Sequence, residues 1–395
     1  MKRLLSLVFI ATFLWATNSS AAPATIPVKD LRLLATAGSL DEVSGIIPLG
    51  STIVIYGTKQ EKSYARSIDA SGNELWKIEL DSQLNSLASV GTVDSLGNIW
   101  IGGSISEAIG NQENTPGAKP INPDNVTTVP EDLDMSLTSV VLWQIDPTTL
   151  SVRHYLLKQT QPVLITSIAI NQTGLSLVGI SPTNKGSAGI LITMNSLGEF
   201  VVPLQIGISS TTLDAVVRNP DGSMTVTGAS AETLKGKKLV GMVDGIIVKI
   251  SQSNEILSVV RSSASKARRN WSSASSTLLL GGEVITGKVV QAAVTKFSTT
   301  YAPQWSNRFT STGKTLTYGS TYAFLASTGP IPQLTKWAPK SPRPIVLIFD
   351  SKGAVVSAYA TPINQREVVG LVSNKSLGLL CVSASKDSVS IFALN

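Results

Sequence analysis

A five-residue motif of the form apolar-x-apolar-x-small occurs seven times and constrains the fold more than any other feature of the sequence. Successive copies begin 46, 76, 49, 54, 44 and 57 residues apart, the longest interval requiring an insertion. Alternating apolar positions are typical of half-buried strands. A period of about 40–50 residues built from short strands is typical of β-propellers. The copies begin at Ile53, Ile99, Leu175, Met224, Leu278, Tyr322 and Leu379.

Turn signals flank these motifs on both sides. A strand and a tight turn precede the motif, as in Thr92–Gly97 and Val216–Gly222. A strand, a turn opened by Asp, Asn or Ser, and a further strand follow it, as in Ser67–Trp76. Such residues bond to the backbone ahead of them, and Gly tolerates the left-handed position of a turn. Each repeat is therefore predicted to form a four-stranded antiparallel blade.

The last repeat lacks its outer strand, because the chain ends after three strands, the last of them at 388–394. One strand-like segment, Leu31–Thr36, stands unassigned before the first blade. An N-terminal strand that completes the C-terminal blade would close the ring and remove its open edges. We therefore expect an all-β, seven-bladed propeller over residues 31–395. Two smaller domains or an open repeat array are the alternatives.

The series Asp69, Gly72 and Trp76 resembles the quinoprotein-type propeller repeat, in which a turn Asp and Gly lead to a Trp packed between blades. The match is full in the first blade and partial elsewhere, although Trp305 stands at the same offset as Trp76. The quinone-dependent dehydrogenases of that family carry a vicinal Cys pair, and this chain has a single Cys. The resemblance therefore implies the fold and the non-enzymatic branch, whose members are envelope scaffolds, and we expect no cofactor.

The N-terminus has the pattern of a secretory signal peptide. Lys2 and Arg3 precede the apolar run 4–16, and Ser20-Ala21-Ala22 offers a small-x-small cleavage site. The run is shorter than the roughly 20 residues that span a bilayer. We expect a signal peptide at 1–22, a linker at 23–30, and a secreted or envelope-associated protein with no transmembrane segment after cleavage. Its net charge falls from +6 to +4 when Lys2 and Arg3 are removed.

The scarcity of metal-binding and nucleophilic side chains excludes many kinds of site. One Cys and one His exclude a disulfide framework, an iron–sulfur cluster and a multi-His metal centre. Cys381 occupies the central apolar position of its motif, so we expect a buried thiol. His154 falls on an outermost strand, where a surface position is expected. Asp69, Asp146 and Asp350 occupy turn positions and are expected to cap the turns, and no metal site is predicted.

The second blade carries the insertion, residues 104–138. It contains six acidic residues against one lysine and has no apolar period. An acidic partner-binding loop and a tolerated, solvated insertion are both consistent with this composition.

Basic side chains gather in loops that a propeller places on one face. They occur in the fourth blade, in the connection between blades four and five, and in the sixth blade. Such a patch attracts an acidic protein or an anionic cell-envelope polymer, although ordinary solubilising charge is the alternative. The candidate ligand-binding residues are Lys235, Lys237, Lys238, Lys266, Arg268, Arg269, Lys336, Trp337, Lys340 and Arg343.

A second group of ionisable residues begins the inner strands, at the rim of the axial channel. The acidic candidates are Asp41, Glu42, Asp214 and Glu367, and Arg269 and Arg366 are the basic residues of the same group. Two close carboxylates would permit acid–base chemistry, whereas the sequence contains no nucleophile elbow, phosphate loop or dinucleotide fingerprint. We favour a non-catalytic, monomeric binding protein that does not bind nucleic acid. An exported hydrolase or lyase that uses the rim carboxylates is the alternative.

Overall fold

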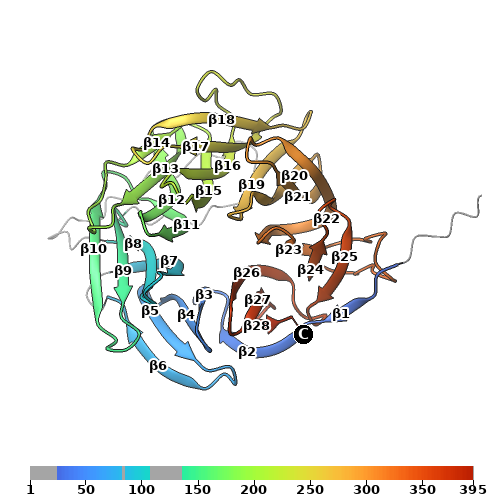
Figure 1. Ribbon diagram of the computed structural model, residues 1–395, viewed down its shortest axis with the longest axis horizontal. Coiled ribbons are helices and arrows are strands. Elements are labelled where there is room, and N and C mark those ends of the chain that lie inside the picture. Colours follow the sequence, from blue (N-terminus) through green and yellow to red (C-terminus); the bar gives the residue numbers. More distant parts are fainter. Residues whose placement is uncertain (1–24, 82–84, 107–135, 395) are drawn as a thin grey trace, which may run out of the picture.

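The computed structural model describes residues 25–81, 85–106 and 136–394, and the regular structure within these ranges is β-strand. Figure 1 looks down a ring of small sheets whose inner strands surround a central opening. Within the described residues the strands form seven four-stranded antiparallel blades, which confirms the expected fold. The predicted signal peptide and residues 107–135 of the predicted insertion lie outside the described residues.

The first four blades follow the order of the chain, each from its inner to its outer strand. Blade one contains β3 (Val43–Leu49), β4 (Thr52–Lys59), β5 (Lys62–Ile68) and β6 (Glu74–Glu79). Blade two contains β7 (Ser86–Val93), β8 (Ile99–Ile105), β9 (Ser139–Ile145) and β10 (Val152–Lys158). Blade three contains β11 (Leu164–Asn171), β12 (Gly174–Thr183), β13 (Gly186–Met194) and β14 (Leu204–Ile206). Blade four contains β15 (Thr211–Arg218), β16 (Met224–Ser230), β17 (Asp244–Ile250) and β18 (Ile256–Ser262).

Blades five and six share one long strand. Blade five contains β19 (Arg268–Ala274), β20 (Leu279–Thr286), β21 (Val289–Phe297) and the first half of β22 (Pro303–Tyr318). Blade six contains the second half of β22, β23 (Tyr322–Ser327), β24 (Arg343–Phe349) and β25 (Val355–Ala360). Blade seven contains β26 (Glu367–Asn374), β27 (Gly378–Ala384), β28 (Val389–Ala393) and β2 (Arg32–Gly38).

The N-terminal strand closes the ring as expected. β2 pairs antiparallel with β28, so blade seven combines both ends of the described chain. Immediately before it, β1 (Val28–Asp30) pairs in parallel with β25, and Ile26 bridges to Leu334. The expected linker at 23–30 thus adds an outer strand to blade six, because its backbone groups find partners along the exposed edge of β25.

The repeated motif forms the second strand of each blade and supplies the core. Its central residue is fully buried in all seven copies, at Ile55, Ile101, Leu177, Val226, Leu280, Phe324 and Cys381. Apolar side chains from neighbouring blades pack together in shared clusters, so the core lies between blades as well as within them. Burial raises the pKa of the Cys381 thiol, which agrees with a structural role.

Every inner strand contains a bulge opposite the last residue of the motif. In blade one the register shifts between Val43 and Gly45, where the strand faces Gly57. A Cβ at Gly57 would lie 1.9 Å from the carbonyl oxygen of Glu42, and one at Gly282 would lie 1.9 Å from that of Asn270. The close approach of the bulged backbone therefore explains why the motif ends in a small residue.

The turn residues act as structural caps. The Asp69 carboxylate accepts hydrogen bonds from the backbone N–H groups of Ser71 and Asn73 at 2.8 and 2.9 Å. Asp146 and Asp350 accept similar bonds from the residues that follow them. His154 is exposed on β10, where its Nε2 lies 3.0 Å from the carbonyl oxygen of Leu80. The three carboxylates thus cap their turns and His154 lies at the surface, as the sequence predicts.

Candidate functional site

The antiparallel blades give the ring two distinct faces. The loops that join the second and third strands of each blade, such as the one between β16 and β17, lie on one face together with the connections between blades. This face is called the loop face. The turns between first and second strands and between third and fourth strands lie on the other, the turn face. All ten predicted ligand-binding residues fall on or next to segments of the loop face.

The predicted rim carboxylates do not converge on one pocket. Asp41 is exposed, and Glu42 forms an ion pair with Lys59 at 2.8 Å. Glu367 and Arg366 line a cavity of about 600 Å³ beside Lys314 at the ends of inner strands, but Asp41, Glu42 and Asp214 do not line it. These four carboxylates therefore do not line this cavity together, and Glu42 is paired within blade one.

The charge of Asp214 instead acts on a carboxylate from blade five, Glu283, that the sequence reasoning missed. Asp214 occupies the bulge of β15, and its Oδ2 lies 3.3 Å from Thr212 Oγ1. Glu283 lies on β20 directly opposite Asn270, whose side chain bonds to Asp214. Burial raises the pKa of Asp214, and burial together with the Asp214 charge raises that of Glu283. A negative charge on Asp214 therefore disfavours ionisation of Glu283.

Lys314 is the second residue that the sequence reasoning missed. It lies in the irregular stretch of β22 between Thr312 and Leu316, and its charge lowers the pKa of Asp214, which burial raises. The only sequence signal for Glu283 is its place directly after the motif residue Gly282. No signal in the sequence relates Lys314 to Asp214, because their blades are separated by blade five.

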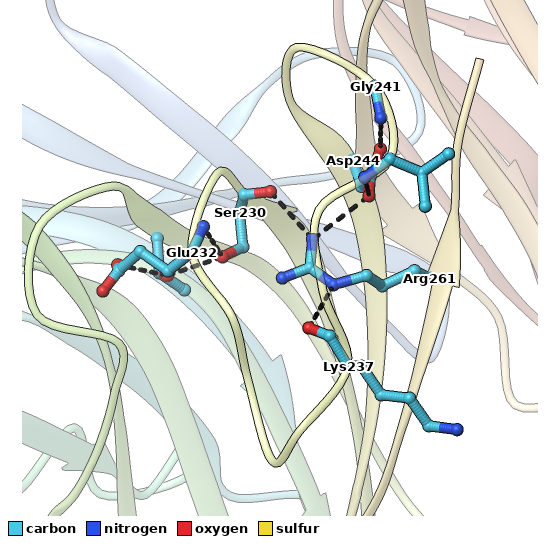
Figure 2. A network of polar contacts seen from close by, with 8 residues as sticks. Ser230, Glu232, Lys237, Gly241, Asp244 and Arg261 are labelled. Atoms are coloured by element: carbon cyan, nitrogen blue, oxygen red, sulfur yellow. Dashed lines mark hydrogen bonds and ion pairs between the residues drawn. The ribbon is translucent and has the colours of Figure 1, made fainter. Parts of the chain in front are cut away.

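A buried ion pair braces the loop of blade four, residues 231–243. Figure 2 shows Arg261 of β18 between the Asp244 carboxylate and two backbone carbonyl oxygens. Arg261 and Asp244 are 3.2 Å apart, and both side chains are almost fully buried. Arg261 Nε also donates to the carbonyl oxygen of Lys237 at 3.1 Å, whereas the Lys237 ammonium points away from the network. The ion pair thus fixes the backbone that carries exposed Lys235, Lys237 and Lys238.

A second carboxylate fixes the other end of this loop. Glu232 accepts hydrogen bonds from the backbone N–H groups of Ile208, Ser209 and Ser210 at 2.8–3.0 Å. It also accepts one from the Thr211 hydroxyl at 2.8 Å. Although burial opposes ionisation, these donors lower the pKa of Glu232 to about 2. The carboxylate therefore stays charged and holds the loop against the start of β15.

The connection between blades four and five lies against the same loop. Met242 N donates to the carbonyl oxygen of Ala267 at 3.0 Å, and Val243 pairs with Arg268. Lys266 and Arg268 are exposed here, so they belong to one surface with the blade-four lysines. Arg269 does not, because its guanidinium lies 4.2 Å from the Trp271 ring centroid and is buried. This corrects its assignment to the exposed surface, and burial with the nearby Arg308 lowers its pKa to about 10.

The blade-six residues form a separate group. Trp337 is buried in the core, and its Nε1 donates to Ser327 Oγ at 3.1 Å. Trp337, named among the candidate ligand-binding residues, therefore packs its apolar ring into the core instead of lying on the exposed surface. Arg343 is half-buried over that ring, and its Nε donates to the carbonyl oxygen of Thr361. Lys336 and Lys340 remain exposed.

The ten predicted residues thus divide into two basic groups instead of one. The loop of Lys336 bonds to the N-terminal segment through Thr335 and Ile26, next to β1. The loop of Lys235 lies over β18, where the Lys235 ammonium donates to the carbonyl oxygen of Ile256. Both loops therefore pack on outer strands rather than over the channel. Among the described residues, the five cations of the larger group form no ion pair; they are Lys235, Lys237, Lys238, Lys266 and Arg268.

The described residues give no sign of a metal centre or a membrane span. No three His, Cys, Asp or Glu side chains among them are placed to hold a metal ion. No helix long and apolar enough to cross a bilayer occurs in the part of the chain that the structure describes.

Comparison with known proteins identifies the fold and no closer relation. No protein-family model matches the chain, and a search of curated proteins found no match. Among solved structures, an ulvan-type polysaccharide lyase has a TM-score of 0.53 at 8% identity, over 93% of this chain and 96% of the lyase chain. The WD40 domain of coronin from Toxoplasma gondii has a TM-score of 0.51 at 10% identity, over 93% and 88% of the two chains.

A third similar structure is a peptidase with a much longer chain. The acylaminoacyl peptidase of Pyrococcus horikoshii has a TM-score of 0.51 at 10% identity, over 92% of this chain. This chain spans about half of the peptidase, 52% of its length. Identities this low show the β-propeller alone, and no quinoprotein family is shown. These structures include two enzymes and a WD40 domain, so the function has to be inferred from the site.

Proposed function

We propose that this protein is an exported, non-catalytic β-propeller that binds an acidic partner at the cell surface or envelope. The contact would be the blade-four basic surface, defined as Lys235, Lys237, Lys238, Lys266 and Arg268. The observation that supports it best is the buried Arg261–Asp244 pair, which fixes a loop whose cations lack described acidic partners. A preformed loop loses less entropy on binding than a mobile one.

Two exposed apolar side chains favour a protein over a simple polyanion. Val240 is 74% exposed and Met242 is 54% exposed, and both lie on the braced loop among the lysines. A protein partner can cover such side chains while its carboxylates meet the cations. An anionic envelope polymer would use the charges alone. We therefore infer an acidic protein partner and treat the polymer as the competing outcome.

Charge reversal of the blade-four basic surface tests the proposal. The purified protein is titrated with poly-L-glutamate, with hyaluronate and with its own envelope fraction at low and high salt. A variant with all five surface residues changed to Glu should lose salt-sensitive binding to the protein partner. The matched control changes five exposed lysines elsewhere to Glu: Lys62, Lys185, Lys352, Lys375 and Lys386.

The two outcomes separate the partner classes. Binding lost in the reversal variant and weakened by Val240→Ser with Met242→Ser would support an acidic protein. Binding that depends on charge but ignores the two apolar changes would identify a polymer. Equal loss in the control variant would contradict the proposed surface, since net charge alone would then account for the binding.

A hydrolase or lyase is the second candidate, and the Asp214–Glu283 pair is the observation that favours it. Two largely buried carboxyl groups with raised pKa values suit general acid–base chemistry. Asp214→Asn and Glu283→Gln should then each abolish turnover of a soluble envelope polysaccharide while leaving its binding intact. Unchanged turnover in both variants would eliminate this candidate.

A further inference from the structure

The turn face carries a groove that none of the predicted residues identified. Two cavities of about 390 and 400 Å³ adjoin each other across blades two and three, and the first continues to blade four. They share five lining residues, so they form one feature, here called the turn-face groove. The shared residues are Asp94, Ser95, Ile170, Asn171 and Gln172.

A half-buried arginine without an acidic partner lies at one end of the groove. Arg218 donates to Asn171 Oδ1 at 3.1 Å, to Ser176 Oγ at 2.6 Å and to Thr173 Oγ1 at 2.7 Å. All three acceptors are neutral, and no described carboxylate lies within ion-pairing distance of Arg218. Burial lowers the pKa of its guanidinium. A desolvated cation with neutral partners favours an incoming anion.

The one carboxylate in the wall of this groove is already satisfied. Asp94 accepts hydrogen bonds from Leu96 N, from Asn98 N and Nδ2, and from Trp100 Nε1, each at 2.9 Å. Although burial opposes its ionisation, these donors lower its pKa. Asp94 therefore shapes the turn and leaves the charge of Arg218 uncompensated.

Apolar side chains flank the other end of the groove. Leu96 in the turn of blade two is 87% exposed, and Leu197 in the turn of blade three is 81% exposed. Both line the second cavity, together with Trp100 and Tyr155, whose rings stack at 5.5 Å. Exposed leucines on both sides of one groove are typical of a protein-binding surface.

A second cation lines the same cavity. Arg153 is exposed on β10, and it forms no ion pair with a described residue. The groove thus combines two arginines with a wall of leucine and aromatic side chains. An inorganic anion or a plain polyanion would leave the leucines uncovered.

We propose that the turn-face groove docks a short peptide segment of a partner protein that carries both carboxylates and apolar side chains. A carboxylate of that segment meets Arg218, and another meets Arg153. An apolar side chain lies between Leu96 and Leu197, over the stacked rings. This site lies on the opposite face from the blade-four basic surface, so the docking proposal does not depend on the proposed function.

A defined peptide tests the docking. A fluorescein-labelled peptide, Leu-Glu-Leu-Glu-Leu, is titrated with the purified protein and followed by fluorescence anisotropy. We expect saturable binding, and binding about tenfold weaker for the matched peptide Leu-Gln-Leu-Gln-Leu, because a charge-assisted contact is lost. Leu96→Ser with Leu197→Ser should also weaken binding about tenfold. Leu257→Ser, a change of an exposed leucine on β18, should not.

Arg153→Gln provides the charge test without risk to the fold. Arg218 bonds to three side chains of blade three, so its replacement endangers folding, whereas Arg153 is exposed. We expect Arg153→Gln to weaken the acidic peptide severalfold and to leave the neutral peptide unchanged. No saturable binding up to about 1 mM would overturn the proposal. Peptide affinity that is the same in the wild type and in all groove variants would also overturn it. A third contradicting result is glutarate binding as tightly as the peptide, since the apolar side chains would then contribute nothing.

Discussion

At the scale of single residues, the last position of the repeated motif carries the clearest packing constraint. Five of the seven copies end in Gly, and in each the inner-strand backbone lies within 2.3 Å of where a Cβ would stand. The copies of blades six and seven end in Ala326 and Ser383, so their inner strands leave room for a Cβ. A composition-based argument would read these glycines as turn formers, but their role is close approach between strands.

Gly57→Ala tests this constraint. The added methyl would lie 1.9 Å from the Glu42 carbonyl oxygen, so the bulge of β3 has to move. We expect a loss of about 2 kcal/mol in the free energy of unfolding, as for overpacking. Chemical denaturation measures it, with Gly370→Ala on β26 as the control, since the nearest atom to a Cβ there is a side-chain carbon of Val382 at 3.3 Å. A loss as large in the control would contradict the explanation.

The coupled carboxylates make a second residue-scale prediction, concerning pH. Because the pKa values of Asp214 and Glu283 are raised in the fold, the folded state binds more protons than the unfolded state from about pH 4 up to these raised pKa values. Their contribution to stability therefore falls as pH rises. Glu283→Gln should raise the melting temperature at pH 7, and the gain should vanish below about pH 4. An equal gain at both pH values would exclude an electrostatic cause.

At the scale of elements, the loop of blade four shows how a buried charge pair can fix a surface. Arg261 and Asp244 have almost no solvent contact, and each also bonds to the backbone of the loop. Such a pair gives little net stability against an apolar replacement, but breaking it leaves an uncompensated charge. We therefore expect the ion pair to act mainly by restricting the motion of the loop, residues 231–243.

Asp244→Asn is expected to release that loop. The change leaves Arg261 buried without a counter-ion and should cost about 3 kcal/mol of unfolding free energy. Hydrogen exchange should rise first at residues 231–243. In the double variant Asp244→Asn with Arg261→Met, the loss of stability should be smaller, since no charge remains buried. Unchanged hydrogen exchange in the loop of the single variant would contradict the claim that the ion pair fixes this loop.

At the scale of the whole molecule, closure depends on one strand from the far end of the chain. β2 covers the edge of β28, and a ring that lacks β2 leaves that strand edge open. β1, by contrast, only adds to a blade that already has four strands. The two N-terminal strands therefore differ sharply in their expected contribution.

Paired truncations measure that difference. A chain that begins at Leu31 loses β1 alone and should melt within a few degrees of the protein that begins at Pro23. A chain that begins at Ser39 also loses β2 and should melt far lower or aggregate, because the edge of blade seven is exposed. Thermal denaturation and light scattering check both. Similar melting of the two truncations would contradict closure by β2.

Much of this architecture is determined locally. Motif spacing, turn residues and the unassigned segment at 31–36 predict seven blades and their closure, because strand periodicity and turn chemistry depend on neighbouring residues. The burial of Cys381, the exposure of His154 and the capping by Asp69 follow from position within a repeat. The segment 25–30 escaped prediction, since its pairing with β25 depends on an edge formed far along the chain.

Which residues make up each candidate site depends on how the blades are arranged in the ring. Arg269 and Trp337 look like surface residues in the sequence, yet packing against neighbours turns both inward. The charge of Asp214 acts on Glu283 only because adjacent blades bring the bulge of β15 near β20. The turn-face groove likewise collects side chains from blades two, three and four. By itself the sequence determined the repeat and its turns, since these arise from contacts between near neighbours. Only the tertiary structure decided which distant side chains meet, since that depends on the angle and spacing between blades.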